Sequence, residues 1–153
     1  MALPWHFGAL ALVALLLGCS NMTPAPPGSS PLANAVVNRE PAIALQLLDS
    51  GASPNSKDER GTAVLILAAV TDQYLLANVL VQRGADVWAA DSMGYTAAIY
   101  ASTSRLDDES DEGKARLAFI SSLRAAGYSW PPPWPKDVLA MREAGRWPPR
   151  PAQ

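Results

Sequence analysis

The chain has 153 residues and carries 12 Lys and Arg against 14 Asp and Glu, which fits one modest domain with short extensions. Its formal net charge of −2 gives no reason to expect nucleic-acid binding, which usually requires a basic face. The single cysteine, Cys19, excludes an intramolecular disulfide, and the single histidine, His6, lies in a segment that we expect to be removed. The mature protein would then lack the imidazole and thiol that Ser-His-Asp or Cys-His catalysis and zinc sites require.

The first predicted element is a signal peptide over residues 1–18. Residues 7–17 form an apolar run with the length of a signal-peptide core, short of the ~20 residues that span a membrane. The run ends in Leu16-Leu17-Gly18-Cys19, which resembles the lipobox of bacterial lipoproteins. The resemblance implies that Cys19 is lipidated and becomes the new N-terminus. Residues 1–6 contain no Lys or Arg, so an uncleaved anchor is the alternative, and both interpretations place the rest outside the cytoplasmic membrane.

The residues after Cys19 bear on which membrane would hold the lipid and on how the domain is linked to it. Ser20 follows Cys19 where an Asp would favour the inner membrane, and resemblance to the sorting rule of two-membrane bacteria therefore favours the outer membrane, facing the periplasm. Residues 19–27 are low in large apolar side chains and are predicted to be a flexible linker.

Residues 28–130 repeat themselves. The segment Gly51-Ala52-Ser53-Pro54-Asn55 returns as Gly84-Ala85-Asp86-Val87-Trp88, thirty-three positions later. The same spacing relates Asp58 to Asp91, and Gly61 to Gly94 and Gly28. It also relates three alanines, Ala35, Ala68 and Ala101, which would allow two helices to approach closely.

Thirty-three residues is the ankyrin period, and the sequence is similar to that family's pattern Gly-x-Thr-Pro-Leu-His-x-Ala. Residues 28–35 fit it with Ser in place of Thr, residues 94–101 and 61–68 fit less fully, and the family's His is absent from all three. The resemblance implies an all-α solenoid of about three helix-turn-helix repeats joined by hairpin-like loops.

Local signals agree with this architecture. Ser30 and Thr96 are predicted to cap helices, and Pro31 suits a first helical turn. The second helix of each repeat carries an apolar stripe, followed by a glycine that ends it. The third repeat is longer, with an insertion expected at 104–113. The stripes are Ile43, Ala44, Leu47, Leu48; Leu76, Ala77, Leu80, Val81; and Leu117, Phe119, Ile120, Leu123, and the glycines are Gly51, Gly84 and Gly127.

Residues 131–153 form a proline-rich tail with a short predicted helix at 136–144, whose apolar side is Val138, Leu139 and Met141. Two interpretations compete. The tail folds back as a cap over the last repeat, with Trp130 and Trp134 as packing residues. Alternatively, it is a proline-rich ligand for a partner's groove.

Candidate catalytic and metal-binding residues are few. The repeat spacing of Asp58 and Asp91 predicts turn residues and no catalytic pair. The acidic segment 107–113 lacks the glycine of a calcium loop at the position of Glu112, which favours a solvated loop. We therefore expect no enzyme activity, catalytic residue, metal or cofactor.

The remaining candidates bind a partner. The resemblance implies a binding surface of loop tips and first helices, and there we expect Arg60, Trp88, Met93, Tyr95 and Tyr100. Trp, Tyr and Arg dominate interface energies. Trp88 stands where the family usually has Asn, and it either forms a binding hot spot or packs beneath the loop against the tail or the next repeat.

The expected function is that of a monomeric, lipid-tethered periplasmic module that binds another protein, and not nucleic acid. One form is an inhibitor or immunity protein for a secreted toxin. Another is an accessory or chaperone-like lipoprotein for an envelope enzyme. The alternatives from other classes are a carboxylate-based envelope hydrolase and a purely structural envelope protein, because fold alone does not choose between functions.

Overall fold

The computed structural model describes residues 28–149, and within that range the chain is all-helical and contains no extended strand. The predictions for the signal peptide, for Cys19 with the linker 19–27, and for residues 150–153 lie outside the described residues. The helices are α1 (Pro31–Val37), α2 (Pro41–Asp49), α3 (Val64–Val70), α4 (Tyr74–Gln82), α5 (Ala97–Thr103), α6 (Asp111–Ala125) and α7 (Pro135–Glu143). No helix between residues 28 and 149 is long and apolar enough to cross a membrane.

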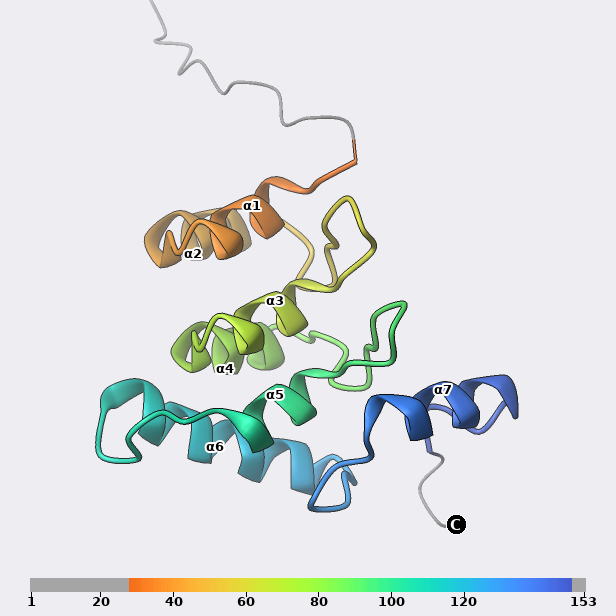
Figure 1. Cartoon of the computed structure of the whole chain (residues 1–153). Helices are drawn as coiled ribbons and strands as arrows, with labels where there is room; N and C mark the ends of the chain where they lie inside the picture. Colours follow the sequence, from red (N-terminus) through yellow and green to blue (C-terminus); the bar gives the residue numbers. More distant parts are fainter. Residues whose placement is uncertain (1–27, 150–153) are drawn as a thin grey trace, which may run out of the picture.

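The first six helices form three successive pairs that stack in chain order (Figure 1). Within the stack, α1 packs on α3, α3 packs on α5, and α4 packs on α6. Two long loops between the pairs project to one side, and α7 lies beside the second of them (Figure 1). We call residues 53–62 the first loop and residues 86–95 the second loop; the same thirty-three positions separate them.

The two loops have the same hydrogen bonds at equivalent positions. In the first loop, the carboxylate of Asp58 accepts bonds from the amides of Arg60 and Thr62, at 3.0 and 2.7 Å. In the second, the carboxylate of Asp91 accepts bonds from the amides of Met93 and Tyr95, at 2.9 and 2.8 Å. The prediction that these two aspartates are turn residues is therefore confirmed.

At the end of each helix pair away from the long loops, hydrogen bonds join successive pairs, and these bonds recur thirty-three positions apart. The Arg39 guanidinium donates to the carbonyl of Thr71, and the Ser104 hydroxyl donates to the carboxylate of Asp72 at 2.7 Å. Arg39 and Asp72 share a positive φ, 58° and 56°, which is uncommon for residues with a side chain. The short connections within the first two pairs thus repeat in backbone conformation as well as in position.

The predicted helix boundaries hold where a local signal specified them. The Ser30 hydroxyl accepts a bond from the amide of Ala33 at 3.0 Å, and the Thr96 hydroxyl accepts one from Ile99 at 3.3 Å. Helix α3 has Ala63 as its N-cap residue and therefore begins without a side-chain cap. Positive φ angles follow the second helices at the three predicted glycines, Gly51, Gly84 and Gly127.

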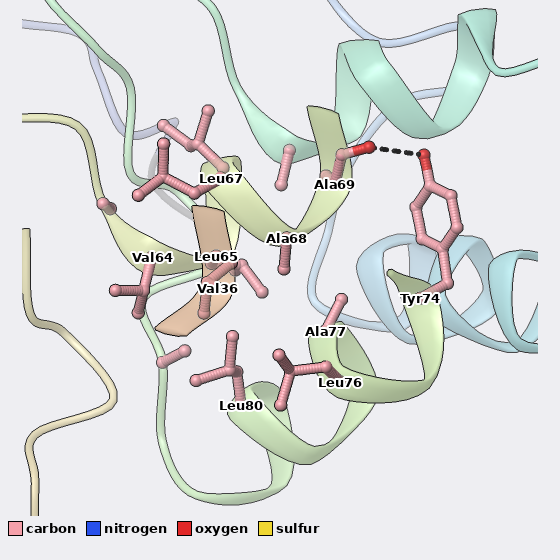
Figure 2. Packing of buried hydrophobic residues seen from close by; sticks show 14 of the residues in the cluster. Val36, Val64, Leu65, Leu67, Ala68, Ala69, Tyr74, Leu76, Ala77 and Leu80 are labelled. Carbon is pink, nitrogen blue, oxygen red and sulfur yellow. Dashed lines mark hydrogen bonds between the residues drawn. The ribbon is translucent and has the colours of Figure 1, made fainter. Parts of the chain in front are cut away.

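The core lies between the helix pairs. Ala35, Ala68 and Ala101 are buried, as their repeat spacing predicted. Figure 2 shows Ala68 of α3 close to the apolar side chains of α4. The hydroxyl of Tyr74 donates to the carbonyl of Ala69 at 3.2 Å, and its ring lies 5.8 Å from that of Phe119. Burial raises the pKa of Tyr74, so its hydroxyl remains protonated as a donor.

Two predicted stripe positions were wrong. Ile43 is 45% exposed although Leu76, thirty-three positions later, is only 3% exposed. The reason is position, because α2 belongs to the first described pair and no earlier pair within residues 28–149 covers it. Leu117 is also 45% exposed. The buried side of α6 follows Ala115, Phe119 and Leu123 at intervals of four, which turns residue 117 away from the core.

The predicted insertion is divided between a loop and a helix. The connection from α5 to α6 covers residues 104–110, and α6 has 15 residues where α4 has 9. The Ser110 hydroxyl caps α6 by accepting a bond from the amide of Gly113 at 3.0 Å. A Cβ at Gly113 would lie 1.9 Å from the carbonyl oxygen of Asp107, so only glycine fits where this loop meets the helix.

The repeat register predicts unequal effects for two matched substitutions. Leu76→Ala should lower the free energy of unfolding by about 2–5 kcal/mol, because it leaves a cavity in the core. Ile43→Ala, at the equivalent but exposed position, should lower it by less than about 1 kcal/mol. Urea unfolding followed by circular dichroism measures both, and equal losses would contradict the burial difference between the first and second pairs.

Candidate binding surface

The tail folds back onto the second loop. Val138 of α7 is fully buried, and the Arg142 guanidinium donates to the carbonyl of Asp91 at 2.9 Å. Gly94 permits the close approach, because a Cβ there would lie 2.4 Å from the carbonyl oxygen of Pro135. The predicted helix 136–144 is therefore present as α7, one residue earlier. The capping interpretation placed the tail over the last repeat, whereas α7 packs against the second loop.

The tryptophans of the tail differ in burial. Trp130 packs partly buried against the core, as the capping interpretation predicted. Trp134 is 58% exposed, so its predicted packing role was wrong. Trp134 is the N-cap residue of α7. A third tail residue, Trp147, packs against the core instead and donates its indole N–H to the carbonyl of Trp88 at 3.0 Å.

Trp88 is a half-buried residue of the second loop, and its ring packs against the segment after α6 and the tail. Its ring stacks on Tyr128 with centroids 3.9 Å apart and meets Trp147 edge-on at 5.5 Å. The Tyr128 hydroxyl donates to the carbonyl of Val87 at 3.0 Å, and burial raises its pKa, which keeps the donor protonated. Of the two interpretations of Trp88, the structure has the packing geometry.

A comparison with Asn55 explains this geometry. Asn55 lies thirty-three positions before Trp88, and its side-chain amide bonds to the amide of Asp86 and the carbonyl of Gly84, at 2.7 and 3.1 Å. Asn55 thereby ties the first loop to the start of the next. Trp88 makes the equivalent junction with the segment after α6 by stacking on Tyr128. An aromatic contact thus replaces an amide bridge at the third step.

The other predicted binding residues are more accessible. Met93 is 65% exposed and Arg60, at the equivalent position of the first loop, is exposed. Tyr95 and Tyr100 are half-buried and stack with ring centroids 5.6 Å apart. These four residues come from the two loops and from α5.

Two hollows connect these residues with others that were not predicted to bind a partner. Arg60 lines a hollow of about 380 Å³ together with Val37 and Leu67 of the first helices α1 and α3. Tyr95 lines another of about 390 Å³ with the exposed Trp134. Val37 and Val70, also thirty-three positions apart, are exposed at the ends of α1 and α3. The repeat spacing is the signal that could have identified these valines.

A third hollow lies between both loops and the tail and has a volume of about 490 Å³. We call it the loop–tail cleft. Its walls combine two basic side chains, two indoles and small apolar residues, and only Trp88 among them was a predicted binding residue. The lining residues are Asn55, Lys57, Gly61, Ala63, Asp86, Trp88, Ala89, Ala90, Arg142, Trp147 and Pro148.

The acidic segment 107–113 is bonded within the chain. Asp108 pairs with Arg116, and the Glu112 carboxylate accepts a bond from the amide of Leu75 at 2.9 Å. Within residues 28–149, no group of three or more His, Cys, Asp or Glu side chains is placed to hold a metal ion. Comparison with models of known protein families gives no match.

The two tryptophans provide a matched test of the packing geometry. Trp88→Ala should lower the free energy of unfolding by about 2–3 kcal/mol, because it removes a half-buried ring and its stacking on Tyr128. Trp134→Ala should change it by no more than about 0.5 kcal/mol, because that ring is largely in solvent. Urea unfolding curves measure both. Two equally small effects would show that the Trp88 ring is not packed against Tyr128.

Proposed function

We propose that the chain is a lipid-tethered protein-binding module of the ankyrin type, held in the periplasm and facing it from the outer membrane. The thirty-three-residue register of bonds at Asp58 and Asp91 supports the repeat assignment. The fit of residues 28–35 to the family pattern supports it as well. Binding by the loops and first helices is the mode that this family resemblance implies.

The observation that carries the proposal is the exposed apolar and aromatic surface at the second loop. Met93 is 65% exposed at the tip, and Trp134 is 58% exposed beside Tyr95. Large apolar side chains in solvent, clustered with aromatic rings, are typical of interaction sites. Methionine is also adaptable, which suits a contact surface that must fit a partner.

The tether follows from Cys19 and the linker 19–27, which precede the described residues. Nine extended residues reach at most roughly 30 Å, so a lipid on Cys19 would keep the domain within that distance of the bilayer. A single binding surface on a tethered monomer suits a protein that blocks or escorts one partner. An inhibitor or immunity protein for a secreted toxin is the form that we favour, and an accessory protein for an envelope enzyme is the second.

A carboxylate-based hydrolase receives no support from the acidic segment. Asp111 lines a hollow with Leu75, Asn78 and Lys114, and the lining of that hollow includes no second acid. General acid–base hydrolysis of a glycan needs two carboxyl groups across one site. The proposal therefore remains a binding function.

A photo-crosslinking amino acid at Met93 tests the proposal in intact cells. The full-length lipoprotein should capture one dominant protein from this position, because the side chain projects from the loop into solvent. The matched control carries the same amino acid at Gln46, which is exposed on α2. Mass spectrometry of the adduct identifies the partner and separates a toxin from an envelope enzyme.

The outcome depends on the difference between the two positions. Capture of the same proteins from both, or of none from Met93, would contradict a binding surface at the second loop. A Cys19→Ser companion separates the tether from the surface, because it should abolish labelling with radioactive palmitate. Retention of the label in that variant would show that Cys19 is not the lipid attachment.

A further inference from the structure

The loop–tail cleft brings together basic side chains from distant parts of the chain. Lys57 comes from the first loop, and Arg142 comes from the end of α7. Neither position has a basic equivalent at the repeat spacing. Ala90 lies thirty-three residues after Lys57, and Glu109 lies thirty-three residues before Arg142. The tail, folded back onto the second loop, supplies one wall of the cleft, and the first loop supplies another.

The charges in the cleft are unequal. Among the bonds of residues 28–149, the Lys57 ammonium has no partner, and Arg142 uses one nitrogen on the carbonyl of Asp91. The only acidic side chain in the lining is Asp86, and its carboxylate already accepts a bond from the amide of Trp88 at 2.9 Å. Two positive side chains and one negative side chain thus line the cleft, although the whole chain has a net charge of −2.

We propose that the loop–tail cleft binds an acidic peptide segment of the protein partner, with a carboxylate held between Lys57 and Arg142. Guanidinium and ammonium groups form strong charge-assisted hydrogen bonds with carboxylates. This inference rests on the proposed protein-binding function and names the chemistry of the segment that is recognised.

The rest of the lining favours a peptide. Ala63, Ala89 and Ala90 form small apolar walls against which a backbone can lie, and Trp88 and Trp147 supply aromatic surface. The volume of about 490 Å³ lies within the roughly 300–1,000 Å³ typical of ligand sites. The cleft and the exposed Met93 share the second loop, so a partner docked on that loop would reach both.

The test uses an acetylated hexaglutamate peptide as the probe and a hexaglutamine peptide as its neutral match. Nuclear magnetic resonance of the full chain follows the signals of the indole N–H groups. The indole N–H of Trp147 donates to the carbonyl of Trp88, and both residues line the cleft. Hexaglutamate should shift the Trp147 signal, and added NaCl should weaken the binding because salt screens the charges. Hexaglutamine should leave the signal unchanged.

Charge reversal locates the binding. Lys57→Glu should weaken hexaglutamate binding by roughly tenfold or more, because it replaces an attractive charge with a repulsive one. Arg105→Glu is the matched control, since Arg105 is exposed on the α5–α6 connection and does not line the cleft. It makes the same change in net charge and should alter the affinity by less than about twofold. Lys57 has no bond to the tail, so its variant keeps the tail in place, whereas Arg142→Glu would also remove the bond to Asp91.

Equal binding of hexaglutamate and hexaglutamine would overturn the inference, as would equal losses in the Lys57 and Arg105 variants. Binding of N-acetylmuramic acid without binding of hexaglutamate would replace the peptide with a cell-wall glycan. If Lys57→Glu leaves capture from Met93 unchanged, the cleft fails while the proposed function stands. If hexaglutamate binds in the cleft and Met93 captures nothing, the proposed function fails instead.

Discussion

Packing between successive helix pairs is the interaction on which the rest of the structure depends. The first helices have 7 residues each, which is too short for independent stability, so each pair requires its neighbours. Buried alanines at 35, 68 and 101 let the helices approach, and the bonds at Asp58 and Asp91 hold the loops in equivalent shapes. The stack therefore presents its loops at regular intervals along one side.

The tail changes the third step of this regular arrangement. Asn55 joins one loop to the next by hydrogen bonds. Trp88, at the equivalent position, instead stacks on Tyr128, and its carbonyl oxygen accepts a hydrogen bond from the indole N–H of Trp147. The tail is then a wall of the surface that we propose binds a partner, as well as a cover for the second loop. Its position leaves Met93 exposed and forms one side of the loop–tail cleft.

Local signals made much of the fold predictable, and distant contacts account for what was not. Helix caps at Ser30 and Thr96 and the turns at Asp58 and Asp91 depend on residues within four positions. The exposure of Ile43 depends instead on its place in the first of the described helix pairs. Four of the predicted binding residues lie on the loops and α5 with accessible surface, but the role of Lys57 depends on where the distant tail lies. No local pattern carries that information.

Amide hydrogen exchange of the full chain and of its Trp147→Ala variant tests whether the tail closes on the second loop. Residues 86–95 should exchange faster in the variant, because the second loop loses its contact with the tail. Residues 53–62, the equivalent first loop with the same internal bonds, serve as the reference and should change much less. Identical exchange of the second loop in both proteins would contradict the docking of the tail.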